Sequence, residues 1–126
     1  MLDALTPETR VIFICSPNNP TGQIVDRDEL EKFIRQVPVE VVIVLDEAYI
    51  EYVPEEKRSD SLSLYREHSN IVILRTFSKA YGLAGLRVGF SISQEPITQA
   101  LRKTAMPFGV ASLAQAAAIP SITAER

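Results

Sequence analysis

Three short, strongly apolar runs in this sequence each end in a polar segment rich in turn-forming residues. The runs cover residues 11–15, 39–45 and 71–74, and the polar clusters that follow them cover residues 16–22, 46–49 and 76–87. Apolar runs of this length, without alternation, are typical of strands covered on both faces. The pattern therefore predicts strands that lead directly into polar clusters.

Segments with helical spacing separate these runs. Asp26 followed by Glu29 forms a capping box, and the apolar positions of residues 30–37 lie on one helix face until Pro38 ends the element. Helices are also expected at 61–68, at 95–104 and from about residue 110, where Pro120 should stop or kink the last one; residues 87–92 read as a fourth strand. The alternation predicts an α/β fold with a mostly parallel sheet flanked by helices.

The polar clusters are the candidate functional site. In open α/β sheets, ligands bind beyond the carboxyl ends of the strands. Because each cluster directly follows a predicted strand, we expect all three to converge on one edge of the sheet.

Lys79 is the most suggestive residue of the third cluster. It lies beside the hydroxyls of Thr76 and Ser78, and Arg87 follows a loop that contains two glycines. A lysine amine can form a Schiff base with a carbonyl, whereas hydroxyls and a guanidinium hold phosphate. The combination suits a phosphorylated aldehyde, of which pyridoxal phosphate is the commonest example. A lone lysine in a polar loop is more often an exposed surface residue, so the other clusters must decide.

The other two clusters supply polar partners for such a ligand. Asp46, at the end of a buried strand, would seek a cation such as a pyridinium nitrogen, although it could also be a helix cap or a surface ion pair. Tyr49 and Asn19 could both bind a phenolate oxygen, but they equally suit a half-buried aromatic residue and a turn. Glu47 is expected to be solvated or capping, and Cys15 a small core residue.

Composition narrows the classes of partner. The 126 residues carry a net charge of −3 with scattered basic residues, and they include one cysteine and one histidine. These features argue against nucleic-acid binding, an internal disulfide and a zinc cluster. Because no apolar run could span a bilayer and the opening residues lack a secretory signal, a metal-free cytoplasmic protein is expected.

Taken together, the motifs resemble a known family. S-P-N-N-P-T-G at residues 16–22, D-E-A-Y at residues 46–49, and T-F-S-K at residues 76–79 with Arg87 are similar to the three signatures of the fold type I, pyridoxal-phosphate-dependent aminotransferases. The closest resemblance is to the histidinol-phosphate aminotransferase group. It covers nearly the whole chain and includes the segment around Pro107 and the alanine-rich tail.

The resemblance implies a role for each motif residue. Lys79 would bind the cofactor as a Schiff base and move a proton, and Asp46 would pair with the ring nitrogen. Tyr49 and Asn19 would bind the ring oxygen. The phosphate would be held by Thr76, Ser78 and Arg87. The implied reaction transfers an amino group from a small-molecule donor to 2-oxoglutarate.

The resemblance also implies how much of the enzyme is present. Family members are much longer and work as homodimers, so residues 1–126 are expected to form part of the large, cofactor-binding domain without the small domain. Alone, this stretch is expected to bind cofactor weakly and to turn nothing over. Three alternatives stay open: an aromatic amino acid aminotransferase, an amino-acid phosphate decarboxylase, and an inactive remnant.

Overall fold

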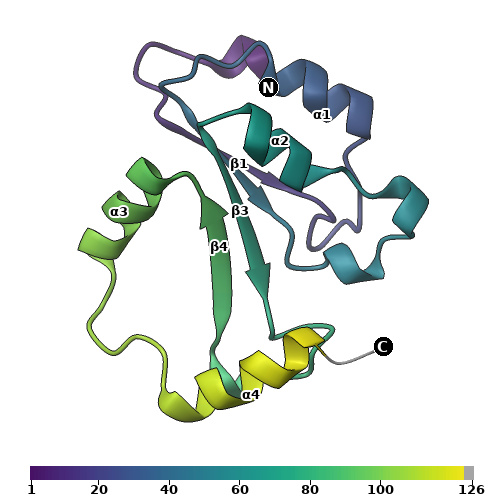
Figure 1. Cartoon of the computed structure of the whole chain (residues 1–126). Helices are drawn as coiled ribbons and strands as arrows, with labels where there is room; N and C mark the ends of the chain where they lie inside the picture. Colours follow the sequence, from purple (N-terminus) through teal and green to yellow (C-terminus); the bar gives the residue numbers. More distant parts are fainter. Residues whose placement is uncertain (124–126) are drawn as a thin grey trace.

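A computed structural model describes residues 1–123 of the chain. Its centre is a four-stranded sheet in the order β1 (Val11–Cys15), β2 (Val42–Asp46), β3 (Ile71–Thr76) and β4 (Gly89–Ser93). The first three strands are parallel, and β4 runs antiparallel to β3 (Figure 1). The expected α/β fold with a mostly parallel sheet is confirmed.

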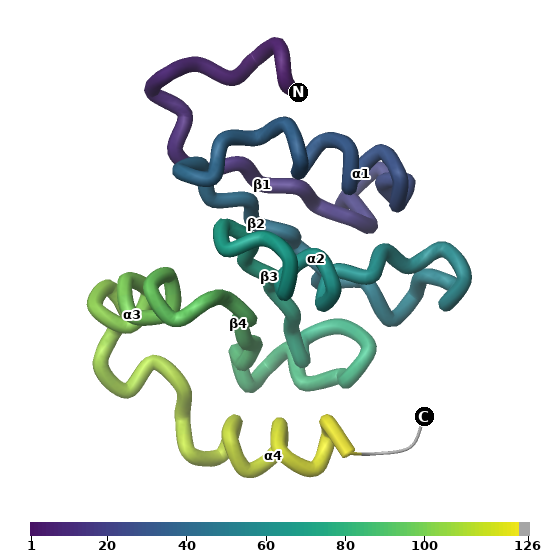
Figure 2. The backbone as a smooth tube through the Cα atoms, turned by 45° about the horizontal axis from the view of Figure 1, so that its top comes forward, coloured from purple at the N-terminus to yellow at the C-terminus, as the bar shows by residue number. Residues whose placement is uncertain are grey.

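Four α-helices accompany the sheet in the described part of the chain. They are α1 (Arg27–Ile34), α2 (Ser61–Glu67), α3 (Glu95–Thr104) and α4 (Ser112–Thr123). Short 3-10 turns lie at Leu2–Ala4, Ile50–Tyr52, Glu55–Lys57 and Ala84–Leu86. In Figure 2 the chain after β4 turns away through α3 and returns to place α4 near the loop that follows β3. No described helix is both long and apolar enough to cross a membrane.

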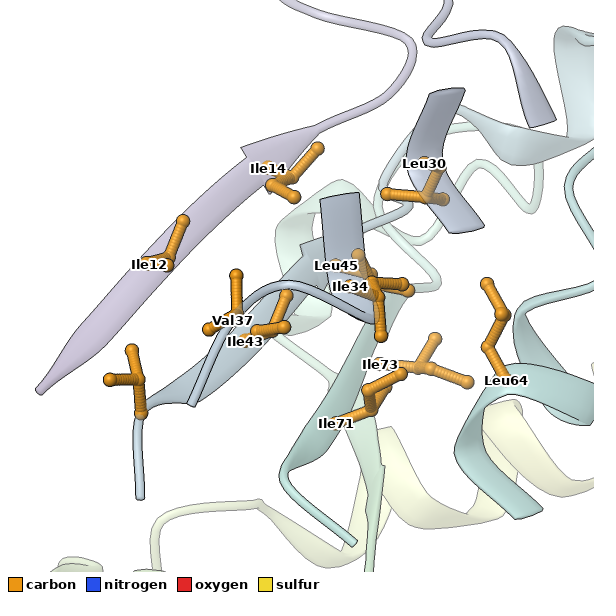
Figure 3. Packing of buried hydrophobic residues seen from close by; sticks show 11 residues of the cluster. Ile12, Ile14, Leu30, Ile34, Val37, Ile43, Leu45, Leu64, Ile71 and Ile73 are labelled. Carbon is orange, nitrogen blue, oxygen red and sulfur yellow. The ribbon is translucent and has the colours of Figure 1, made fainter. Parts of the chain in front are cut away.

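The main core lies between α1, α2 and one face of the sheet (Figure 3). On that face, isoleucine and leucine side chains from neighbouring strands are paired in register, such as Ile12 with Ile43 and Ile43 with Ile71. The buried cluster consists of Ile12, Ile14, Leu30, Ile34, Val37, Val41, Ile43, Leu45, Leu64, Ile71 and Ile73. Packing of this cluster holds the three parallel strands in place and thereby positions their carboxyl ends.

A second, smaller cluster ties α4 to the end of β3. It contains Phe77, Val88, Ala114 and Ala118. Of the two outcomes expected for Pro120, a stop or a kink of the last helix, the stop is wrong, because α4 continues to Thr123 with Pro120 inside it. Proline lacks the backbone donor that would reach the Ala116 carbonyl; one residue further on, the Ser121 hydroxyl donates to the Ala117 carbonyl at 2.8 Å.

Several element boundaries differ from those expected, three of them for a clear local reason. Strand β2 begins at Val42 rather than residue 39, because the Val41 N–H donates to the Pro38 carbonyl and closes a turn. Strand β4 begins after Arg87, whose positive φ of 53° is incompatible with a strand. Helix α1 ends at Ile34 and not at residue 37; Asp26 caps its first turn as expected.

The expectation for Cys15 is also wrong. Strand β1 alternates between exposed and buried positions, and Cys15 is exposed on the same side as Val11 and Phe13. The reason is its position in the sheet. Strand β1 lies at an edge, and α1 and α2 cover only the face that carries Ile12 and Ile14.

Candidate active site at the carboxyl ends of the strands

The polar clusters after β1 and β2 meet at one edge of the sheet. These strands are parallel neighbours, with Cys15 opposite Asp46 at their carboxyl ends. From the loop after β1, the Asn19 side-chain amide donates to the Tyr49 hydroxyl at 3.2 Å. The predicted convergence of these two clusters is therefore confirmed.

The loop after β3 brings Lys79 to the same edge. Phe77 anchors the loop because it is 3% exposed, and the Ser78 N–H donates to the Thr76 hydroxyl at 3.0 Å. The Lys79 side chain is exposed, and its Nζ lies 5.0 Å from the centroid of the Tyr49 ring. Within residues 1–123 this amine forms no ion pair or hydrogen bond. It is thus available to a ligand.

Arg87 returns to the site because the chain folds back on itself. The loop turns at Gly82, whose N–H donates to the Lys79 carbonyl at 2.9 Å and whose φ is +70°. Arg87 adopts the left-handed conformation, which is uncommon for a residue with a side chain and typical of functional sites. Its guanidinium donates to the Ala84 carbonyl at 2.8 Å, the one hydrogen bond it forms in the described chain. Four of its N–H groups remain for an anion.

Asp46 ends β2 with its carboxylate half-buried. One oxygen accepts from the Ala48 N–H at 3.1 Å. Among residues 1–123 no lysine or arginine is paired with this carboxylate. A half-buried carboxylate without a cation is a suitable partner for a positively charged group of a ligand.

The expected site residues divide between two adjoining pockets. Five of them line an open, polar pocket of about 310 Å³, namely Asp46, Thr76, Ser78, Lys79 and Arg87. Asn19 and Tyr49 line a neighbouring, mainly apolar pocket of about 380 Å³. The Tyr49 ring, close to the Lys79 amine, connects the two.

The polar pocket fits pyridoxal phosphate. It has a carboxylate from β2 and an amine, two hydroxyls and a guanidinium from the loop after β3. Its volume lies at the lower end of the range for small-ligand sites. The donor set matches a ligand that combines a cationic ring nitrogen, an aldehyde and a phosphate.

Two charged residues at this edge were missed or misread from the sequence. Glu47 is buried rather than solvated, and it forms an ion pair with Arg75 at 2.8 Å. Arg75 lines the same pocket as Lys79. A signal was present, because each of these opposite charges stands at the end of an apolar strand.

Comparison with known proteins identifies the family. The family model for aminotransferases of class I and II matches residues 1–126, the whole chain. The chain belongs to the class I and II aminotransferases. A crystal structure of histidinol-phosphate aminotransferase from Sinorhizobium meliloti, solved in complex with pyridoxal-5'-phosphate, has a TM-score of 0.82 and 35% identity over 90% of this chain. It supports pyridoxal phosphate as the cofactor of this aminotransferase chain, as expected.

Other relatives are named for a different substrate class, aromatic amino acids. An aromatic amino acid aminotransferase from Streptomyces avermitilis is 59% identical over 99% of this chain and 35% of its own length. The aromatic aminotransferase of Pyrococcus horikoshii has a TM-score of 0.85 at 26% identity, over 98% of this chain and 34% of its own. The match covers 30% of the length of the S. meliloti enzyme. This aminotransferase chain therefore spans about a third of the length of the relatives that it matches.

Proposed function

We propose that the protein is a pyridoxal-phosphate-dependent aminotransferase that uses aromatic amino acids as donors. The observation that carries this choice is the 59% identity to an aromatic amino acid aminotransferase, against 35% to a solved histidinol-phosphate aminotransferase. The expectation from sequence placed histidinol phosphate first, and it now stands as the second candidate. We further propose 2-oxoglutarate as the acceptor and a homodimer as the working form.

The available amine of Lys79 is the centre of the proposed chemistry. When bound, pyridoxal phosphate supplies an aldehyde that takes up the amino group and a ring that accepts electrons. Lys79 would hold the cofactor through its amine and would move the proton at the substrate's α-carbon. The Tyr49 ring, 5.0 Å away, limits where this amine can move.

The remaining residues hold and polarise the cofactor in this proposal. Asp46 would keep a proton on the ring nitrogen, because its carboxylate has no cationic partner in the described chain. Asn19 and Tyr49, whose side-chain amide nitrogen and hydroxyl oxygen lie 3.2 Å apart, would bind one ring oxygen together. The hydroxyls of Thr76 and Ser78 and the Arg87 guanidinium hold the phosphate.

Covalent labelling tests the role of Lys79. The protein, expressed from its natural gene at full encoded length, is mixed with pyridoxal phosphate, reduced with borohydride and digested for mass spectrometry. We expect one cofactor per chain on the peptide that contains Lys79 and none in Lys79→Ala. Lys57→Ala, which removes an exposed lysine outside the pocket, should label like the parent. Labelling spread over several lysines would contradict the proposal.

A comparison of donors tests the substrate class. Phenylalanine and histidinol phosphate are each supplied with 2-oxoglutarate, and kcat/KM is measured for both. We expect phenylalanine to give the higher value. A higher value for histidinol phosphate would restore the second candidate, and release of carbon dioxide would indicate a decarboxylase.

A further inference from the structure

The loop between β1 and α1 carries Asn19, and hydrogen bonds fix both of its ends. At its start, the Ser16 N–H donates to the Asp46 carbonyl at 3.1 Å, which continues the pairing of β1 with β2. At its end, the Val25 N–H donates to the Ser16 hydroxyl at 3.0 Å. The loop of residues 16–25 is therefore closed at its base, and its interior needs restraints of its own.

Asn18 and Thr21 restrain the interior of this loop. The Asn18 side-chain amide donates to the Thr21 hydroxyl at 2.7 Å, and the Gln23 N–H donates to the same hydroxyl at 3.4 Å. The backbone of Asn18 adds two bonds, because its N–H donates to the Gln23 carbonyl at 2.8 Å and its carbonyl accepts from the Gly22 N–H at 2.6 Å. The Thr21 hydroxyl thus links the residue directly before Asn19 to the returning part of the loop.

The Asn19 side chain depends on this loop for its direction. It is exposed, and its amide donates to the Tyr49 hydroxyl at 3.2 Å, the one hydrogen bond of this side chain in the described part of the protein. An asparagine on an exposed loop has several rotamers, so the place of its amide depends on where the backbone holds its Cα. Thr21 itself lines neither the polar nor the apolar pocket of the site. Its hydroxyl therefore acts on a ligand there through the residues that it holds.

We propose that Thr21 is a positioning residue whose hydroxyl holds Asn18 and thereby fixes the adjacent Asn19 amide beside the Tyr49 hydroxyl, where the two bind the ring oxygen of the cofactor. The inference rests on the proposed function, because it takes Asn19 and Tyr49 to bind that oxygen. It adds a residue that acts through Asn18 and Asn19 and not through contact with the ligand.

The test compares variants of the protein at its full encoded length. Thr21→Val keeps the branched shape of the side chain and removes the hydroxyl, whereas Thr21→Ser keeps the hydroxyl. Thr9→Val is the matched control, since the Thr9 hydroxyl also accepts from a backbone N–H, that of Thr6 at 3.0 Å, but before the start of β1. For each variant, the absorption of the bound cofactor is followed against pH, and the thermal midpoint is measured.

Asn19→Ala supplies the reference, because it removes the proposed donor to the ring oxygen. A hydrogen bond to a titrating group moves the pKa of that group, so its loss shifts the pH midpoint of the absorption of the bound cofactor. We expect Thr21→Val to shift this midpoint in the same direction as Asn19→Ala by roughly 0.3 to 1 pH unit, the size that one hydrogen bond allows. Thr21→Ser and Thr9→Val should titrate like the parent.

A double variant separates positioning from a general loss of structure. Because Thr21 acts through Asn19 in this proposal, Thr21→Val/Asn19→Ala should titrate within about 0.2 pH unit of Asn19→Ala alone. A further shift in the double variant, an unshifted Thr21→Val, or a shift in Thr21→Ser as large as that in Thr21→Val would each overturn the proposal. Should Thr21→Val fail to fold, Asn18→Ala removes the other partner of the same hydrogen bond and is judged by the same limits.

Cofactor-free crystal structures separate this inference from the proposed function. The inference requires the Asn19 amide to lie within hydrogen-bond distance of the Tyr49 hydroxyl in the parent and in Thr21→Ser, and beyond it in Thr21→Val. An unchanged contact in Thr21→Val overturns it. A parent protein that does not bind pyridoxal phosphate at Lys79 would overturn the proposed function instead, whereas an Asn19→Ala variant that titrates like the parent would overturn the role of Asn19 and this inference with it.

Discussion

At the scale of single residues, Tyr49 joins the two halves of the site. Its hydroxyl accepts from Asn19, which follows β1, and its ring faces the amine of Lys79, which follows β3. Tyr49 itself follows β2. One side chain thus contacts residues from both neighbouring strand ends, so a shift of any of the three strands would alter its contacts.

A second residue-scale feature is the cap of α2. Asp60 accepts from the Ser63 hydroxyl at 2.8 Å and from the Ser63 N–H at 3.0 Å. These hydrogen bonds hold the pKa of the Asp60 carboxyl below its ordinary value, the Ser63 side chain first. A carboxyl with a lowered pKa stabilises the fold fully above its unfolded pKa, and this contribution is lost as the pH falls through its folded pKa.

We therefore expect Ser63→Ala to raise the pKa of Asp60 toward its ordinary value, because the largest cause of the shift is removed. The cap should then weaken at a higher pH than in the parent. Carbon-13 NMR titration of the Asp60 carboxyl measures this directly. Ser69→Ala, an exposed serine beyond the helix, serves as the control; identical Asp60 titrations in parent and Ser63→Ala would contradict the prediction.

At the scale of elements, the close pairing of β3 and β4 positions Arg87 relative to Thr76. Gly89 pairs with Thr76, and a Cβ at Gly89 would lie 2.7 Å from the Arg75 carbonyl oxygen. That distance is well below van der Waals contact, and the obstacle is backbone that cannot rotate away. A side chain at this position would force the two strands apart.

Gly89→Ala should accordingly destabilise the protein by about 1–3 kcal/mol, the usual cost of overpacking. Gly85→Ala is the matched control, because a Cβ there meets nothing within 4 Å and the backbone is unstrained. It should change the free energy of unfolding by less than about 0.5 kcal/mol. Urea denaturation measures both, and equal effects of the two substitutions would refute the role of close strand approach.

The sequence predicts the elements well where local pattern decides. The bounds of β1 and α3 match the expected ranges, since an apolar run and an amphipathic segment determine them. It fails where tertiary contacts decide: Arg87 lies outside the strand with a positive φ, and Pro120 does not stop α4. The site motifs are readable in order, but the burial of Glu47 depends on its pairing with Arg75 from a different strand, and the pattern around either residue alone does not show that the two meet.

At the scale of the whole molecule, the face of the sheet opposite the main core is left uncovered at β1, and so is one side of α4, by the described residues. Phe13 is 64% exposed on β1, and Ile119 and Ile122 are 69% and 63% exposed on α4. Parallel sheets are normally covered on both faces, and exposed apolar patches promote association. Much of this surface needs a covering that residues 1–123 do not supply.

Residues 1–126 expressed alone should therefore self-associate and bind an apolar fluorescent dye. Phe13→Ser with Ile119→Ser should reduce both effects, whereas Val39→Ser should not, because Val39 is exposed in an isolated turn. Analytical ultracentrifugation and dye fluorescence measure the outcome. A monomer that binds no dye would contradict the prediction that this exposed apolar surface promotes association.

The order of the strands has a consequence for how such a protein can evolve. Strands β1, β2 and β3 are neighbours in the sheet in the same order as in the chain, and the candidate cofactor residues from Asn19 to Arg87 all lie within that one stretch of the sequence. A recombination event outside that stretch can exchange neighbouring segments and leave these residues together. An event within it would separate residues that must face one another across the same edge of the sheet.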